Sequence, residues 1–107
     1  MSYRIQFTHS ASADLDNIAQ WIARNDSVEQ ALHVLKKIEE KVESLQQNPQ
    51  RGVFPPELRA LGLKKYREVF FKPYRVIYQV RARTVIIHLV ADGRRDMSAL
   101  LQRRLID

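Results

Sequence analysis

The chain has 107 residues, with 18 Lys and Arg against 12 Asp and Glu and a formal net charge of +6. This length predicts a single domain over residues 1–107 and leaves no room for a second one. The chain has no cysteine, which excludes disulfides, thiolate metal sites and a cysteine nucleophile.

The positive charge is concentrated in the second half of the chain. Residues 1–58 carry 6 basic and 8 acidic side chains, a balance of −2, whereas residues 59–107 carry 12 basic and 4 acidic, a balance of +8. Such a distribution is typical of a protein that binds an acidic or polyanionic partner, and it is equally typical of a surface that only keeps the protein soluble. No apolar stretch approaches the roughly 20 residues that span a bilayer, and no signal-peptide pattern is present. We therefore expect a cytoplasmic protein without membrane contact.

The first elements are predicted to be a strand and a helix. Residues 3–8 alternate between apolar and polar side chains, which indicates a strand. Over residues 10–25 the apolar positions instead recur at helical spacing, as Leu15, Ile18, Ala19 and Ile22. Ser10 is the predicted N-cap of this helix. Trp21 lies beside the stripe, and we interpret it as a packing residue.

A second helix is predicted to begin after Ser27, because Ser27 and Gln30 have the spacing of a capping box. It ends at Asn48-Pro49 and carries a seven-residue repeat of two sets: Val28, Leu35 and Val42, and Ala31, Ile38 and Leu45. Two helices joined by two or three residues favour an antiparallel hairpin. A free-standing coiled-coil dimer is the alternative.

The second half is predicted to be a loop followed by a sheet. Residues 49–65 contain three prolines and two glycines, so we expect a loop with one turn at Glu57–Leu61. The strands are predicted at Tyr66–Lys72, Tyr74–Arg81 and Thr84–Ala91. The alternation in the second strand predicts one apolar and one mixed face. A last helix, capped by Asp96 or Ser98, follows. Helices bunched before a meander of strands indicate an α+β fold.

Standard catalytic motifs are absent from the sequence. It has no glycine-rich phosphate loop, and its three histidines fall in different elements without metal-ligand spacing, so we expect no cofactor and no metal. The candidates for function are the basic residues of the second half. Arg67 and Arg75 lie on adjacent predicted strands, so their side chains can converge on one sheet face, with Arg94 and Arg95 at its edge. Such a cluster suits an RNA backbone, a phosphoester transition state or an acidic segment.

Several of these segments together resemble the RelE/ParE superfamily of bacterial toxins. They are Tyr74–Val80, the apolar strand and Gly93–Asp96 that follow, and, upstream, Ala13–Leu15 and Asn48-Pro49. The resemblance covers about residues 3–105. It implies the toxin of a type II toxin–antitoxin module, of the kind that stabilises plasmids and inhibits growth. It also implies an N-terminal strand, an α-helical hairpin, a three-stranded antiparallel meander and a short C-terminal helix.

The superfamily divides by target. RelE-like members are metal-independent, ribosome-dependent mRNA endonucleases, whereas ParE-like members inhibit DNA gyrase and thereby replication. By position, Arg67 stands where RelE-like toxins have a sheet lysine, Arg75 at their sheet arginine and Arg95 at the arginine after the last strand. The second sheet lysine meets Glu68 or Val69, and Leu101 occupies the position of the C-terminal tyrosine.

These departures favour the ParE-like branch. Arginines stabilise charge but transfer protons poorly, and Leu101 transfers none. The resemblance therefore implies a non-enzymatic gyrase inhibitor. The alternative is an endoribonuclease acting on ribosome-bound mRNA, with Arg67, Arg75, Arg95 and His88 as its catalytic residues. A third possibility is a basic binding module or an inactive toxin.

All of these interpretations share a cognate antitoxin as partner. We expect its C-terminal segment to fold on binding, to lay a helix on the hairpin and to contact the sheet edge. Its acidic residues are expected to meet the basic half of the chain, at Arg75, Arg94, Arg95, Arg103 and Arg104. Contact with DNA is expected only indirectly, through the antitoxin.

Overall fold

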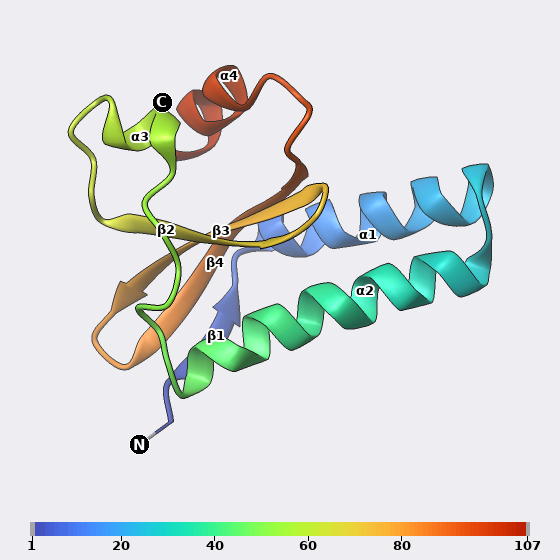
Figure 1. Cartoon of the computed structure of the whole chain (residues 1–107), viewed down its shortest axis with the longest axis horizontal. Helices are drawn as coiled ribbons and strands as arrows, with labels where there is room; N and C mark the ends of the chain where they lie inside the picture. Colours follow the sequence, from blue (N-terminus) through green and yellow to red (C-terminus); the bar gives the residue numbers. More distant parts are fainter. Residues whose placement is uncertain (1, 107) are drawn as a thin grey trace.

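A four-stranded sheet separates two groups of helices in the computed structural model, which describes residues 2–106 (Figure 1). The strand order is β1-β4-β3-β2, with β1 parallel to β4 and the other pairs antiparallel. The elements are β1 (Arg4–Phe7), α1 (His9–Asn25), α2 (Val28–Glu43), η1 (Ser44–Gln46), α3 (Pro56–Arg59), β2 (Tyr66–Phe71), β3 (Tyr74–Arg81), β4 (Thr84–Asp92), α4 (Met97–Leu101) and η2 (Gln102–Ile106). The predicted fold class is confirmed.

The two long helices form the predicted hairpin, but the first begins earlier than expected. Thr8, not Ser10, is its N-cap, because the Thr8 hydroxyl accepts a hydrogen bond from the Ala11 amide at 3.1 Å. Thr8 follows β1 directly and keeps an extended backbone, so the helix begins where the strand ends. Ser27 caps α2 as predicted and accepts from the Gln30 amide at 3.0 Å.

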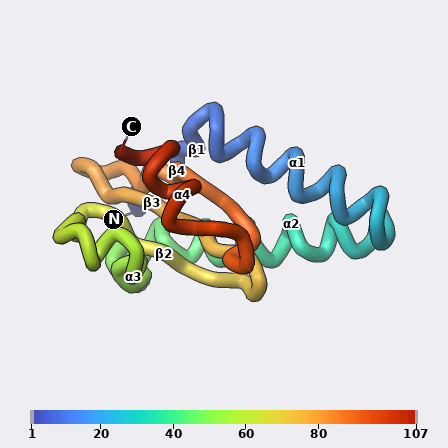
Figure 2. The backbone as a smooth tube through the Cα atoms, turned by 90° about the horizontal axis from the view of Figure 1, so that it is seen from above, coloured from blue at the N-terminus to red at the C-terminus, as the bar shows by residue number. Residues whose placement is uncertain are grey.

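The seven-residue repeat predicted the buried face of α2 only in part. Its buried residues are Ala31, Val34, Ile38 and Val42, and Leu45 follows in η1. Val28 is instead 60% exposed, because it lies at the tip of the hairpin, which extends beyond the sheet (Figure 2). Trp21 is 61% exposed, so its interpretation as a packing residue was wrong. Within the sheet-covered part of α2 the buried set differs from the repeat at one position, where Val34 is buried and Leu35 is only half-buried.

Both faces of the sheet are covered, whereas the sequence predicted one covered face. One core lies between the sheet and the α1–α2 hairpin, and it contains Val76, Tyr78 and Ile87. The other lies between the opposite face and α3, α4 and the C-terminal turn, and it contains Ile77, Leu89 and Leu101. Alternate residues of β3 therefore enter different cores. The mixed face was misjudged because its polar residues alternate with apolar ones that α4 covers.

The long loop before β2 is held against the sheet by Tyr78. The Tyr78 hydroxyl donates to the Pro49 carbonyl at 2.7 Å and accepts from the Gly52 amide at 3.0 Å. A Cβ at Gly52 would lie 2.5 Å from that hydroxyl, so glycine is required there for this close approach. The loop contains one helical turn, α3, at Pro56–Arg59 instead of the predicted Glu57–Leu61. None of the helices in residues 2–106 has the length and apolar character that crossing a membrane requires.

Candidate partner-binding groove

A groove of about 430 Å³ runs between α1 and the end of the sheet where β3 begins and β4 ends. Ile18, Val90 and Ala91 supply apolar surface to it, and the exposed indole of Trp21 stands at its border. Its lining is Asp14, Asn17, Ile18, Trp21, Tyr74, Val90, Ala91, Asp92, Arg94 and Arg95. An apolar strip beside an exposed tryptophan, with polar groups around it, is the usual composition of a protein-binding surface.

Two arginines border the groove, and they differ in their electrostatics. The Arg94 guanidinium contacts the Asp92 carboxylate through Nε at 2.9 Å and Nη2 at 2.5 Å, and this pairing lowers the pKa of Asp92. Arg95 is exposed and forms no ion pair with any residue in the described range. Burial raises the pKa of Tyr74, so its phenol stays protonated as a hydrogen-bond donor. Arg95 therefore offers the groove an uncompensated positive charge.

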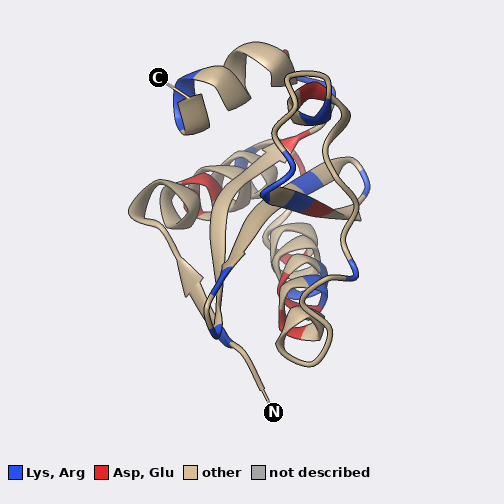
Figure 3. Ribbon diagram, turned by 90° about the vertical axis from the view of Figure 1, so that its left-hand side faces the viewer, with Lys and Arg blue, Asp and Glu red and all other residues tan. Residues whose placement is uncertain are grey.

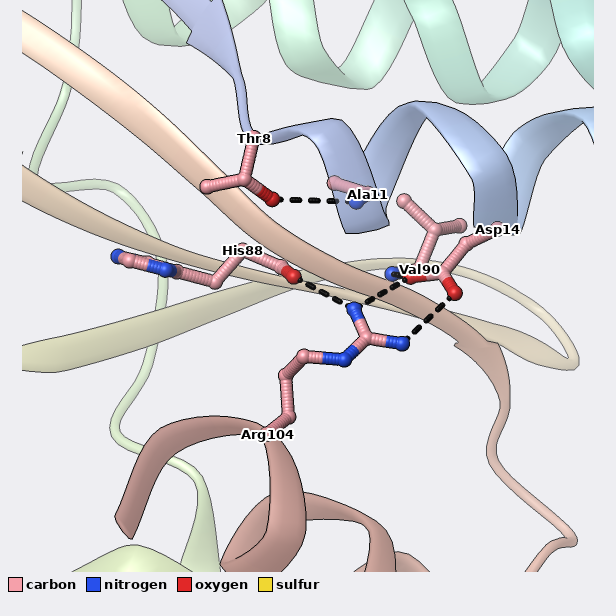
Figure 4. Close-up of polar contacts among 6 residues, drawn as sticks. All are labelled: Thr8, Ala11, Asp14, His88, Val90 and Arg104. Carbon is pink, nitrogen blue, oxygen red and sulfur yellow. Dashed lines mark hydrogen bonds and ion pairs between the residues drawn. The ribbon is translucent and has the colours of Figure 1, made fainter. Parts of the chain in front are cut away.

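The wall of the groove is fixed by an ion pair between Asp14 of α1 and Arg104 of the C-terminal turn (Figure 4). The pair is bidentate, with Nη1–Oδ2 at 3.0 Å and Nη2–Oδ1 at 2.9 Å. Asp14 also accepts from the Val90 amide at 3.0 Å, and Arg104 donates to the His88 carbonyl at 2.9 Å. Because β1 ends at Phe7, which pairs with Ile87, these side chains take over the hydrogen bonding of the β4 edge beyond it.

The predicted site residue Arg75 is held inside the protein by two carboxylates. Its Nη1 and Nη2 bind Glu57 at 2.9 and 2.8 Å, and its Nε binds Glu68 at 2.7 Å. The hydrogen bond from Arg75 lowers the pKa of Glu57, whereas burial raises the pKa of Glu68, which is only 2% exposed. Arg75 is thus neutralised by partners from α3 and β2 and does not line the groove.

Arg67 lies on the opposite face of the sheet from Arg75, so the two side chains do not converge as expected. In the pairing of β2 with β3, Arg67 stands opposite Tyr78, whose side chain belongs to the hairpin core. The Arg67 guanidinium donates to the Gly52 carbonyl at 2.8 Å and lies 4.5 Å from the centre of the Phe54 ring. Adjacent strands did not suffice for convergence, because the register places the two arginines on alternate sides.

His88 and Leu101 lie on the α4 side of the sheet. A β-bulge between Ile77/Leu89 and Tyr78/Ile87 leaves His88 as the extra residue of β4. Its Nε2 is 3.1 Å from the Gln79 Oε1, its ring packs edge-on to Tyr66, and burial lowers its pKa. Leu101 is buried in the core beneath α4, whereas Arg103 is exposed on η2. The four predicted catalytic residues therefore belong to separate environments.

Several residues of the groove were not predicted from the sequence. Asp14 was noted only as part of a motif and Trp21 only as packing, and Glu57 and Glu68 were not linked to Arg75. The exposed tryptophan had a signal, since Trp21 lies outside the helical stripe formed by Leu15, Ile18 and Ile22. Within residues 2–106, no three His, Asp or Glu side chains gather in a way that would hold a metal ion.

Comparison with known proteins identifies relatives along nearly the whole chain. A family model described as the ParE toxin of the type II toxin–antitoxin system parDE matches residues 5–97. Toxin ParE3 of Caulobacter vibrioides is 30% identical over 101 residues, which are 94% of this chain and 97% of that protein.

Two solved structures are similar in fold. A chain of the chromosomal ParDE toxin–antitoxin system from P. aeruginosa has a TM-score of 0.70 at 24% identity, covering 85% of this chain and 96% of that one. A mutant of the E. coli toxin RelE in the free state has a TM-score of 0.63 at 15% identity, covering 98% of this chain and 100% of that one.

Proposed function

Because the chain belongs to the ParE toxin family of type II toxin–antitoxin systems, we propose that it inhibits DNA gyrase and that a cognate antitoxin neutralises it. The proposed mechanism is binding without chemistry by the toxin itself. The proposal includes a cytoplasmic location for the protein, and a role of its toxin–antitoxin module in plasmid stabilisation and growth inhibition.

The observation that carries this proposal is the state of Arg75. A ribonuclease needs a free cation at the scissile phosphate and a group that accepts the 2′-hydroxyl proton. The charge of Arg75 is compensated by Glu57 and Glu68, and Arg67 binds carbonyls on the other face of the sheet. His88 is half-buried beside Gln79 and Tyr66. This arrangement supports a role in binding over RNA cleavage.

The target is tested by two assays on the same purified protein. We expect the toxin to inhibit supercoiling of relaxed plasmid by gyrase and to leave mRNA intact in a reconstituted translation system. Addition of the antitoxin encoded beside the toxin should restore supercoiling. Cleavage of mRNA on ribosomes together with normal supercoiling would overturn the proposal and support the endoribonuclease alternative. Absence of both effects would indicate an inactive toxin.

The groove is the proposed site of the antitoxin. One structural neighbour comes from a ParDE toxin–antitoxin system, which supports an antitoxin as the partner. The strip of Ile18, Val90 and Ala91 suits the apolar face of a helix, and the free charge of Arg95 suits an acidic residue at its border. This location differs from the expectation that Arg75 takes part, because its guanidinium is already bound by carboxylates.

Replacement of Trp21 tests this site. Trp21→Ala is expected to weaken antitoxin binding by roughly 30-fold or more, because an exposed tryptophan that becomes buried in an interface often contributes about 2 kcal/mol or more. The fold should be unchanged, since the indole is 61% exposed. The measurement is isothermal titration with the cognate antitoxin. Leu61→Ala is the matched control, because Leu61 is 64% exposed and does not line the groove. Equal affinities of both variants and the unaltered protein would exclude the groove.

A further inference from the structure

A cluster of positive charge lies at the opposite end of the sheet, at the turn between β3 and β4. Arg4, Arg81 and Arg83 are exposed there, and none of them forms an ion pair with a described residue. Figure 3 shows blue segments at this turn. This cluster is not part of the groove proposed to bind the antitoxin. We call Arg4, Arg81 and Arg83 together the turn patch.

The sheet register places the arginines of the turn patch side by side. Thr84 pairs with Arg81 on one side and with Arg4 on the other, and the Arg4 amide donates to the Arg83 carbonyl at 2.9 Å. Side chains of paired residues leave the same face, so Arg4, Thr84 and Arg81 form one row across three strands. Ile5 and Phe7 pack into the hairpin core, which leaves Arg4 on the other face.

The segments that surround this row of side chains contain further lysines and no carboxylates. Residues 2–8, 60–67 and 79–91 contain Lys64 and Lys65 but no Asp or Glu. Lys65 lies 5.4 Å from the centre of the Tyr66 ring. After burial, the nearby charges of Arg81 and Lys65 also lower the pKa of His88, which keeps that ring neutral. The arginines of the turn patch therefore have no carboxylate partner within these described segments.

The character of the turn patch distinguishes among anionic ligands. The exposed large apolar residues of the described chain include none in β1, β3 or β4, so an anchoring site for a peptide is lacking there. Single-stranded nucleic acid is usually bound through exposed aromatic rings. Tyr66 is buried instead, and Arg83 covers the Tyr3 ring at 5.6 Å. Exposed arginines beside Gln6, Gln79 and Thr84 suit contacts to phosphate oxygens.

We propose that the turn patch of Arg4, Arg81 and Arg83, with the neighbouring Lys65, binds the phosphate backbone of duplex DNA without reading its sequence. The contact is direct, in contrast to the expectation that DNA is reached only through the antitoxin. Its setting rests on the proposed function, because gyrase holds the duplex on which such a toxin would act. In that setting the groove faces a protein partner and the turn patch faces DNA.

The test measures binding of the purified toxin to a labelled duplex of about 20 base pairs by fluorescence anisotropy, between roughly 50 and 200 mM salt. One variant combines Arg4→Gln, Arg81→Gln and Arg83→Gln. The matched control combines Arg24→Gln, Lys36→Gln and Lys72→Gln, which removes the same charge from exposed residues of the helical hairpin and of the turn between β2 and β3. Thermal unfolding of each variant verifies that all three proteins are folded.

We expect the turn-patch variant to bind roughly tenfold or more weakly at about 50 mM salt and to lose about 2.7 from the slope of log K against log salt. The control should stay within about twofold of the unaltered protein. Equal losses of affinity in the turn-patch variant and the control would show that only net charge matters, and would overturn the proposal. Tighter binding of single-stranded RNA than of duplex DNA in the same measurement would also overturn it. The binding measurement contains no gyrase. Its result therefore does not depend on whether the protein inhibits gyrase, which the supercoiling assay tests separately.

Discussion

The variant Arg75→Met is expected to lose about 3–5 kcal/mol of its free energy of unfolding at pH 7, because it leaves two carboxylates without their cation. Glu57 and Glu68 both bind the Arg75 guanidinium, and the side chain of Glu68 is almost fully buried. Urea denaturation followed by circular dichroism measures the loss. Arg59→Met is the matched control, since Arg59 is exposed and forms no ion pair with a described residue.

The stability difference between this variant and the unaltered protein is expected to shrink as the pH falls from 7 towards about 4.5. In the unaltered protein the pKa of Glu57 is lowered from 4.5, so its contribution is present above that pH and is lost as the pH falls through the folded value. Burial already raises the pKa of Glu68 in the unaltered protein, and loss of the Arg75 cation should raise it further, while the pKa of Glu57 is no longer lowered by Arg75. The folded variant then binds more protons than the folded unaltered protein does, so its stability deficit becomes smaller towards acid pH.

A second substitution separates this effect from loss of packing. Adding Glu68→Gln to Arg75→Met removes the buried charge while keeping the shape of the side chain, so the double variant should recover part of the stability at pH 7. A single variant as stable as the unaltered protein would contradict the ion-pair account. The endoribonuclease alternative instead treats Arg75 as a catalytic group whose loss leaves the fold intact, so the same measurement also bears on that alternative.

The variant Asp14→Ala is expected to lose about 3 kcal/mol of its free energy of unfolding, equivalent to roughly 12 °C in Tm. The substitution leaves the Arg104 guanidinium and the Val90 amide without their acceptor in a partly buried site. Differential scanning calorimetry measures the effect. Asp16→Ala, on the exposed side of the same helix, should change Tm by only about 2 °C. Similar losses in the two variants would show that helix propensity, rather than the network, is responsible.

The pattern of the sequence predicted the order and type of the elements because each repeat is local. The alternation at Tyr74–Arg81 and the helical stripe of Leu15, Ile18 and Ile22 both report one buried face, and both elements are present. The cap of α1 was missed because Thr8 and Ser10 are both suitable capping residues. The strand that precedes the helix decides between them, since the extended backbone ends at Thr8.

The site could not be predicted as well, because its contacts join residues far apart in the chain. Arg75 meets Glu57 across 18 residues, and Arg104 meets Asp14 across 90. From the sequence alone, all the arginines of the second half are equally good candidates for binding a partner. In the structure, some of their guanidinium groups are bound by carboxylates within the protein. The groove likewise needs Trp21 of one helix and Arg95 after the last strand to lie together. Neither local periodicity nor charge counting contains that information.

The parallel pairing of β1 with β4 sets the order in which the protein can fold during synthesis. Among the described strands, β1 pairs with β4 alone, and Arg4 stands opposite Thr84. Such distant pairings close late, because the chain between them must first be ordered. Until residues 84–95 have left the ribosome, β1 has no neighbour and the groove lacks Val90, Ala91 and both of its arginines. A nascent chain therefore lacks the proposed antitoxin site until its last strand has been made.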